Sequence, residues 1–193
     1  IAEALDSKGI ELRFESTNSA LYFEGKFLKK DTETFIKILS DILRFPKFDS
    51  DVLANLKEQY NAYLLELETE TDEISKNQLA RALYPVNHPN FSTKVTKLRE
   101  SLPSINSLDL ENFHKNYYGD NSMKIVFAGD VNFPKIQKFI RSYFINWKTK
   151  SKNKTEPKDL SKNTEKNYNV YIPDKTSVSV SMGSRTFLKR NDP

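Results

Sequence analysis

The sequence contains no cysteine, only five scattered glycines and only two histidines. The lack of cysteine excludes disulfides, thiolate catalysis and cysteine-ligated zinc within these residues. The glycines are too far apart for a phosphate-binding loop, and no GxSxG motif is present to carry a serine nucleophile. No run approaches the roughly 18 apolar residues that a membrane helix needs. We therefore expect no membrane span in this segment.

Neither histidine belongs to a metal-binding motif. The HExxH and HxxEH spacings, which place two histidines on one face of a helix to hold zinc, are absent from the sequence. His88 lies in the proline-flanked loop NHPN, where we interpret it as a turn residue bonded to backbone. His114 lies in the stretch LENFHKNYYGDNSMKIVFAGDV, on an apolar helical face, and we interpret it as scaffold.

The excess of basic residues is confined to one segment. The chain has 30 lysines and arginines against 26 acidic residues, and residues 148–166 alone hold seven of the lysines and three of the acidic residues. The rest of the chain is therefore balanced in charge. A nucleic-acid-binding protein should carry a basic face on its folded part. We expect no nucleic-acid partner, and a solvated linker in this segment.

Hydrophobic periodicity predicts both helices and strands. Residues 10–16 and 19–28 alternate between apolar and polar side chains, which predicts an antiparallel strand pair. Apolar stripes of helical spacing predict further elements at 31–45 with Asp31 as N-cap, from Asp49 to Leu67, at 73–83, from a Ser107 cap, and at 133–144. Three further strands are predicted at 123–129, 167–173 and 176–183. The fold class is therefore α+β, a mostly antiparallel sheet packed against helices.

The predicted elements and the composition together suggest a domain division. Residues 1–148 form one α+β module that lacks its N-terminal part, because the opening segment IAEALDSKG begins as the end of a helix. Residues 149–166 form the lysine-rich linker. Residues 167–193 supply the first strands of a following module, so we interpret the chain as an excerpt from a longer protein.

An acidic run, LLELETETDE, ends the second long helix. Each carboxylate near a helix C-terminus interacts unfavourably with the macrodipole and destabilises the helix by about 0.3–1 kcal/mol. Solvent exposure keeps this cost small, and a bound cation would offset it. On a helical wheel Glu66 and Glu70 fall beside the apolar stripe, and Glu68 points away from it. We take Glu66 as the one candidate ligand, for a metal held mainly by residues outside this chain, with a solvated acidic helix end as the alternative.

Several segments, taken in order, resemble the pitrilysin/insulinase family of zinc metallopeptidases, the inverzincins. They are IAEALDSKG, LSDILRFPKFDSDVLANLKEQYNAYLLELETETDE, LYPVNHPN, SLDLENFHKNYYGDNSMKIVFAGDV and VYIPDKTSVSVSMG. The resemblance covers nearly the whole chain. It implies a helix bearing HxxEH, whose histidines bind zinc and whose glutamate activates water, and a further zinc-binding glutamate downstream. It also implies peptide substrates enclosed between two half-shells.

The resemblance places the catalytic motif outside this chain. HxxEH would precede IAEALDSKG, and the downstream zinc glutamate would fall at Glu66. The segments LYPVNHPN, FEGKFLKKD and IPDKTSVSVSMG resemble the non-catalytic half-modules of the family, in which the helix has lost its ligands. The implied function is the substrate-chamber wall of a zinc-dependent metallopeptidase, with this chain inactive alone. Zn²⁺ would reside in the parent protein or the partner half, with none bound to this chain.

The implied partners are a second half-module, in the same chain or in a partner subunit, and peptide substrates. Two alternatives remain open. One is a catalytic module whose HxxEH lies upstream of Ile1. The other is a non-enzymatic scaffold or core subunit resembling the processing peptidases. The sequence does not decide the location, and both a periplasmic and a cytoplasmic one stay open.

Overall fold

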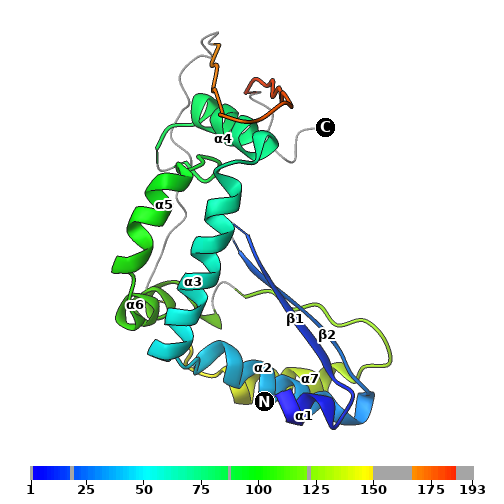
Figure 1. Ribbon diagram of the computed structural model, residues 1–193. Coiled ribbons are helices and arrows are strands. Elements are labelled where there is room, and N and C mark those ends of the chain that lie inside the picture. Colours follow the sequence, from blue (N-terminus) through cyan, green and yellow to red (C-terminus); the bar gives the residue numbers. More distant parts are fainter. Residues whose placement is uncertain (1, 18–19, 87, 121–122, 150–166, 186–193) are drawn as a thin grey trace. The chain divides into compact units, whose positions relative to one another are not determined.

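The computed structural model describes residues 2–17, 20–86, 88–120, 123–149 and 167–185. It confirms the α+β class: helices accompany one antiparallel sheet formed by β1 and β2 (Figure 1). The strands are β1 (Glu11–Ser16) and β2 (Leu21–Lys26). The α-helices are α1 (Ala2–Asp6), α2 (Thr32–Arg44), α3 (Ser50–Leu67), α4 (Thr71–Leu83), α5 (Val95–Ser101), α6 (Ser107–Tyr117) and α7 (Phe133–Phe144), with short 3-10 helices η1 (Lys29–Asp31) and η2 (Leu102–Ser104).

The chain divides into two compact units. Unit 1 comprises Ile1–Ser50 with Asn106–Lys154, and unit 2 comprises Asp51–Ile105 with Thr155–Pro193. Each unit is described by itself below. The predicted boundaries of the module and the following strands remain a prediction, and the predicted linker lies almost entirely outside the described residues.

The core of unit 1 lies where α2 and α7 pack side by side beneath the β1–β2 ribbon (Figure 1). Both helices are strongly amphipathic, as the sequence predicts, so each presents one apolar face to the other. The ribbon contributes Leu12, Leu21 and Phe23 to this core from its inner face. The buried members of the cluster are Ile10, Phe35, Ile36, Leu39, Leu43, Ile136 and Phe144.

The helix caps differ in detail from the predicted ones. Asp31 does occupy the N-cap position of α2, but its carboxylate makes no cap bond. It is buried, and it accepts a hydrogen bond of 2.9 Å from Lys8 Nζ instead. Helix α6 is capped one residue earlier than predicted, by Asn106, in a reciprocal capping box with Asp109. Asn106 satisfies two free N–H groups of the first turn, which Ser107 in the helix itself cannot do.

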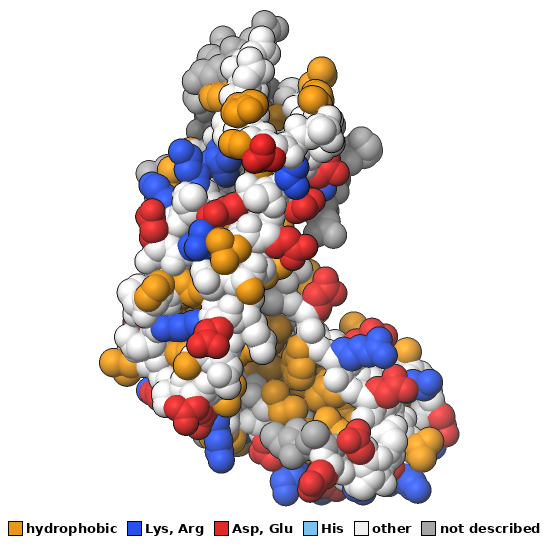
Figure 2. Space-filling view, viewed as in Figure 1, with side chains coloured by type: hydrophobic (Ala, Val, Ile, Leu, Met, Phe, Trp, Pro, Cys, Tyr) orange, Lys and Arg blue, Asp and Glu red, His pale blue; other side chains and the backbone are white. Residues whose placement is uncertain are grey.

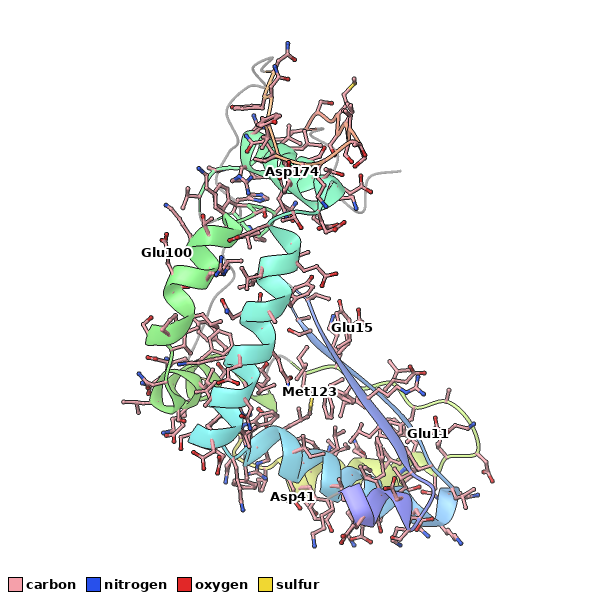
Figure 3. The ribbon with its side chains drawn as sticks, viewed as in Figure 1. Glu11, Glu15, Asp41, Glu100, Met123 and Asp174 are labelled. Atoms are coloured by element: carbon pink, nitrogen blue, oxygen red, sulfur yellow. The ribbon has the colours of Figure 1, made fainter. Side chains whose placement is uncertain are left out.

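The predicted buried strand at 123–129 is wrong. The segment is extended, and Met123, labelled in Figure 3, packs with Phe127 against the unit 1 core. Val126 on the opposite face is nevertheless 91% exposed. No ladder joins this segment to another described strand. A strand requires a hydrogen-bonded neighbour, and alternation in the sequence gives the faces of a segment but not its neighbour.

The apolar stripe of α3 is also less buried than its periodicity predicts. Leu64 is fully buried, but Leu56, Tyr60 and Tyr63 are exposed. A periodic stripe shows which face of a helix is apolar and not which element covers it. Helix α5, a seven-residue element, was not predicted at all.

Acidic and basic side chains are interspersed over the visible face of the molecule (Figure 2). This mixture matches the balanced charge of the sequence outside residues 148–166. No described helix combines the length and the apolar character that crossing a bilayer requires.

Candidate functional site

Glu66, the predicted metal ligand, lies in the last turn of α3, and its side chain is exposed. Its backbone carbonyl oxygen accepts hydrogen bonds from the backbone N of Thr69 at 3.0 Å and from Thr69 Oγ1 at 3.1 Å. These bonds close the end of the helix and leave the carboxylate directed into solvent. The structure therefore places Glu66 on a solvated helix end in unit 2.

The described residues do not fit a zinc ion. Among them, no group of three or more His, Cys, Asp and Glu side chains lies close enough together to hold a metal. A catalytic zinc needs three protein ligands with a fourth position left open for water. One exposed carboxylate supplies one ligand at most, so no catalytic step can be assigned to zinc on these residues. Whether Glu66 completes a site with other chain segments remains a prediction.

The neighbouring carboxylate Glu68 does not point away, contrary to the helical-wheel prediction. It is half-buried, and its two oxygens accept hydrogen bonds of 2.9 and 3.0 Å from Arg99 Nη1. Arg99 Nε also donates to Asn61 Oδ1 at 3.1 Å. The guanidinium thereby ties α5 to Asn61 in α3 and to Glu68, which directly follows that helix. Because α5 was not predicted, the sequence offered no partner for Glu68, and this carboxylate has a structural role in unit 2.

His88 takes the structural position that the sequence predicts for it. Its Nδ1 accepts a hydrogen bond of 3.0 Å from the backbone N of Asn90, which stabilises the turn. The imidazole also stacks on the ring of Tyr84, with 4.5 Å between ring centroids. Both interactions are local, and they account for the orientation of this side chain.

His114 belongs to a contact between three elements of unit 1. Its Nε2 lies 2.7 Å from the carbonyl oxygen of Leu43, in the last turn of α2. Its ring stacks on Tyr118 at 5.1 Å between centroids and meets the edge of Phe48 at 5.9 Å. Trp147 stacks at 6.5 Å. The imidazole thus bridges α6 to the end of α2 through aromatic contacts and one hydrogen bond.

The same side chains line a surface pocket of about 690 Å³ in unit 1. Its volume lies within the range of small-molecule sites, about 300–1,000 Å³. Aromatic and cationic side chains dominate the lining, together with two carboxylates. The aromatic residues are Phe48, His114, Tyr118 and Trp147, the cationic ones are Arg44, Lys47, Lys115 and Lys148, and the carboxylates belong to Asp49 and Glu111. Sequence reasoning considered His114 here and gave the other lining residues no site role, because residues 44–49, 111–118 and 147–148 come together only in the folded unit.

Most cationic side chains of the pocket already have hydrogen-bond or ion-pair partners within the protein. Arg44 donates to the carbonyl oxygens of Tyr143 and Ile145, the latter at 3.2 Å, and so satisfies the C-terminal end of α7. Lys115 pairs with Glu111 at 3.2 Å. Lys148 pairs in the same way with Asp120 at 3.0 Å. Around the pocket, side chains therefore donate hydrogen bonds to backbone carbonyl groups at helix ends. The described groups that line it do not include a nucleophile paired with a general base.

Displaced pKa values in the structure have local causes. The hydrogen bond to Glu73 raises the pKa of Lys76, assisted by the charge of the same carboxylate. Burial lowers the pKa of Arg81. The hydrogen bond to Glu33 raises the pKa of the Tyr143 phenol, with smaller contributions from burial and nearby carboxylates. These side chains do not line the pocket, so their displaced pKa values result from contacts that stabilise the fold.

Much of the chain is similar in sequence to a protein family and to two named proteins. Residues 104–192 match a family profile described as peptidase M16 inactive domain. Over 130 residues the chain is 28% identical to the non-peptidase homolog YmxG of Helicobacter pylori, a match covering 67% of this chain and 30% of that protein. Over 141 residues it is 25% identical to mitochondrial-processing peptidase subunit beta of Neurospora crassa, covering 72% of this chain and 29% of that one.

Comparison with solved structures agrees on the fold. The crystal structure of a peptidase M16 inactive domain from Pseudomonas fluorescens matches with a TM-score of 0.64 and 19% sequence identity, over 74% of this chain and 34% of that one. At this identity the likeness bears on the fold alone. The chain spans about a third of the length of the relatives that it matches.

Proposed function

We propose that this chain forms the wall of a substrate chamber and not its catalytic centre. The premise is that the chain is a non-catalytic half-module of the pitrilysin/insulinase (M16) type. The observation that carries the proposal is the match of residues 104–192 to the inactive domain of the family. The exposed position of Glu66 and the scattered carboxylates and histidines of the described residues support it.

The proposed wall works by pairing with a second half-module, in the same polypeptide or in a partner subunit. The second half would hold the zinc ion and supply its ligands, since a lone carboxylate cannot retain catalytic zinc with an open coordination position. Peptides would bind between the halves, where this chain shapes and closes the chamber. If the second half carries out catalysis, the polar residues of this half are available to stabilise the fold, as His114 and Arg44 do.

The test is the zinc content and peptidase activity of the full-length parent protein, assayed with its partner half and in two variants. Glu66→Gln removes the one candidate ligand, and Glu70→Gln is a matched control at an exposed position four residues along the chain. We expect both variants to retain the zinc and activity of the wild type. Loss of both properties in Glu66→Gln alone would identify Glu66 as a ligand and this chain as part of a catalytic module.

A second candidate function is a scaffold with no peptidase activity in any part of the assembly. The likeness to a protein named as a non-peptidase homolog favours it. It predicts that the parent, purified with its natural partner, contains no stoichiometric zinc and cleaves no unfolded polypeptide. About one zinc per assembly, together with cleavage, would exclude the scaffold and leave the chamber wall.

A further inference from the structure

The pocket of unit 1 is lined by one face of α6 and by residues at the ends of two other helices. Its side on α6 is formed by residues spaced three and four apart, which therefore share one face of that helix. They are Glu111, His114, Lys115 and Tyr118. The rest of the lining comes from the end of α2 with residues 45–49, and from residues 147–148 after α7. Helix α6 lies beside the end of α2 (Figure 1), so the pocket belongs wholly to unit 1.

Four rings give the pocket an aromatic surface that stays partly open to solvent. Phe48, His114, Tyr118 and Trp147 are each half-buried, and together they form the aromatic cluster of the pocket. The imidazole stacks on Tyr118 and Trp147 and meets the edge of Phe48. These contacts hold the rings in place. The cluster therefore offers a fixed surface on which another ring can pack by stacking or by an edge contact.

Two of the four cationic side chains around the pocket are neutralised by carboxylates. Lys115 pairs with Glu111, four residues earlier on α6, and Lys148 pairs with Asp120. These two pairs cancel in the charge balance of the pocket.

The other two cationic side chains have no carboxylate partner among the described residues. Arg44 donates to carbonyl oxygens, which carry no formal charge. Lys47 is exposed, and its ammonium group makes no hydrogen bond or ion pair with any described residue. The one remaining carboxylate of the lining belongs to Asp49. One positive charge is therefore in excess on the lining that also carries the aromatic cluster.

We infer that this pocket is a binding site for a small organic monoanion in which an aromatic ring is joined to a carboxylate group. The carboxylate matches the single excess charge and pairs with the Lys47 ammonium, while the ring packs on the aromatic cluster. A phosphate monoester carries a charge of about −1.5 to −2 at neutral pH and matches this balance less well. An inorganic anion would fill only a small part of about 690 Å³ and would leave the rings uncovered.

Two sources supply this chemistry. One is a free aromatic acid, and the other is the C-terminal residue of a peptide that ends in an aromatic side chain. Both present a ring and a carboxylate on the same residue-sized group. Binding of such an anion requires neither zinc nor peptidase activity, so it is independent of the proposed function.

Ligand-observed NMR titrations of the full-length parent with three matched probes test the binding. N-acetylphenylalanine carries both groups, N-acetylphenylalaninamide keeps the ring without the charge, and N-acetylalanine keeps the charge without the ring. We expect a dissociation constant of about 0.1–1 mM for N-acetylphenylalanine, and binding at least about tenfold weaker for the other two probes. Equal binding of either incomplete probe would overturn the inference. So would the lack of saturable binding of N-acetylphenylalanine up to about 10 mM.

A substitution pair locates the site on the parent protein. Lys47→Gln removes the unpaired charge and should weaken the binding of N-acetylphenylalanine by about 3–10-fold, the effect of one exposed charge pair. Lys37→Gln is the matched control, at an exposed position of α2 that does not line the pocket, and should leave the affinity unchanged. Both lysines are exposed, so both variants should fold. Equal affinities in the two variants would place the binding elsewhere and overturn the inference.

A short peptide that ends in phenylalanine, compared with the same peptide amidated at its C-terminus, separates the two sources. Binding at least as tight as that of N-acetylphenylalanine, and lost on amidation, would support a peptide C-terminus as the ligand. Binding of the free acid alone would support a small aromatic acid. Either result supports the site, and zinc content and peptidase activity do not enter these measurements.

Discussion

The imidazole Nε2 of His114 lies 2.7 Å from the carbonyl oxygen of Leu43, and this contact joins α6 to the last turn of α2. Carbonyl groups in the last turn of a helix have no partner within that helix. Because a carbonyl oxygen can only accept, His114 carries a proton on Nε2 in this contact. The histidine therefore satisfies a helix end, which supports its interpretation as scaffold.

His114→Ala should lower the free energy of unfolding of unit 1 by about 1–3 kcal/mol, because it leaves the Leu43 carbonyl unsatisfied and removes a stacked ring. The single tryptophan of the chain, Trp147, stacks near His114 and reports on this unit in urea titrations followed by fluorescence. His88→Ala is the matched control, since it removes only the local contacts with Asn90 and Tyr84. A cost for His114→Ala no larger than that of the control would contradict the scaffold role.

The amphipathic helices of unit 1 could be predicted from the sequence because their pattern is strong and local. The prediction for α7 covered the same twelve residues as the observed Phe133–Phe144. For α2 the predicted end at residue 45 lies one residue beyond the observed Arg44. Pro46 follows, and the residue before a proline avoids helical geometry. The turn role of His88 was also local, and the structure confirms it.

What could not be predicted depends on distant partners. Glu68 meets Arg99 across 31 residues of sequence, and no periodicity marks such a pair. The segment 123–129 has the alternation of a strand, but a ladder depends on a second segment that alternation does not specify. The pocket around His114 joins residues from three parts of the chain, so only the folded arrangement reveals it.

Gly25→Ala should destabilise unit 1 by about 1–3 kcal/mol through overpacking. Gly25 pairs with Leu12 in the ribbon, and an added Cβ would lie 2.3 Å from ring carbons of Phe35. Phe35 has no room to retreat, because it is buried and stacked on Phe27 with 4.2 Å between ring centroids. Urea unfolding followed by the fluorescence of Trp147 measures the change.

A double-mutant cycle separates this clash from a general effect of the substitution. Phe35→Leu alone should also destabilise unit 1, but in the Gly25→Ala background it should cost less, since the smaller side chain makes room for the new methyl group. Strictly additive effects of Gly25→Ala and Phe35→Leu would show that the two side chains do not meet as described.

Arg99→Ala should destabilise the packing of α5 on α3 by about 1–2 kcal/mol, because it leaves the half-buried Glu68 without its donor and removes the bond to Asn61. Arg99→Lys should cost less than Arg99→Ala, since it keeps the charge but lacks the fork of the guanidinium. Faster hydrogen exchange in peptides covering Val95–Ser101 is the measurement. The control, Lys76→Ala, removes an exposed pair with Glu73 and should leave these peptides unchanged.

The bond between Tyr143 and Glu33 should make the stability of unit 1 sensitive to alkaline pH. Tyr143 donates from its hydroxyl to Glu33 Oε1 at 2.9 Å and so links α7 to α2. This bond raises the pKa of the phenol above its ordinary value of 10.0. The folded state then retains the proton more strongly than the unfolded state does. Its contribution to stability is therefore complete below pH 10 and is lost as the pH rises through the higher folded value.

Absorbance titration of the tyrosines tests this directly, because phenolate formation is visible in the ultraviolet. Subtracting the titration of Tyr143→Phe from that of the wild type should isolate one phenol that ionises above its ordinary pKa of 10.0. Glu33→Gln should move that step back toward the ordinary value, since a neutral amide oxygen accepts the phenol's hydrogen bond more weakly than a carboxylate does and no longer repels the phenolate. A difference curve centred at the ordinary value in the wild type would show that the bond does not persist in solution, and the alkaline loss of stability would then have another cause.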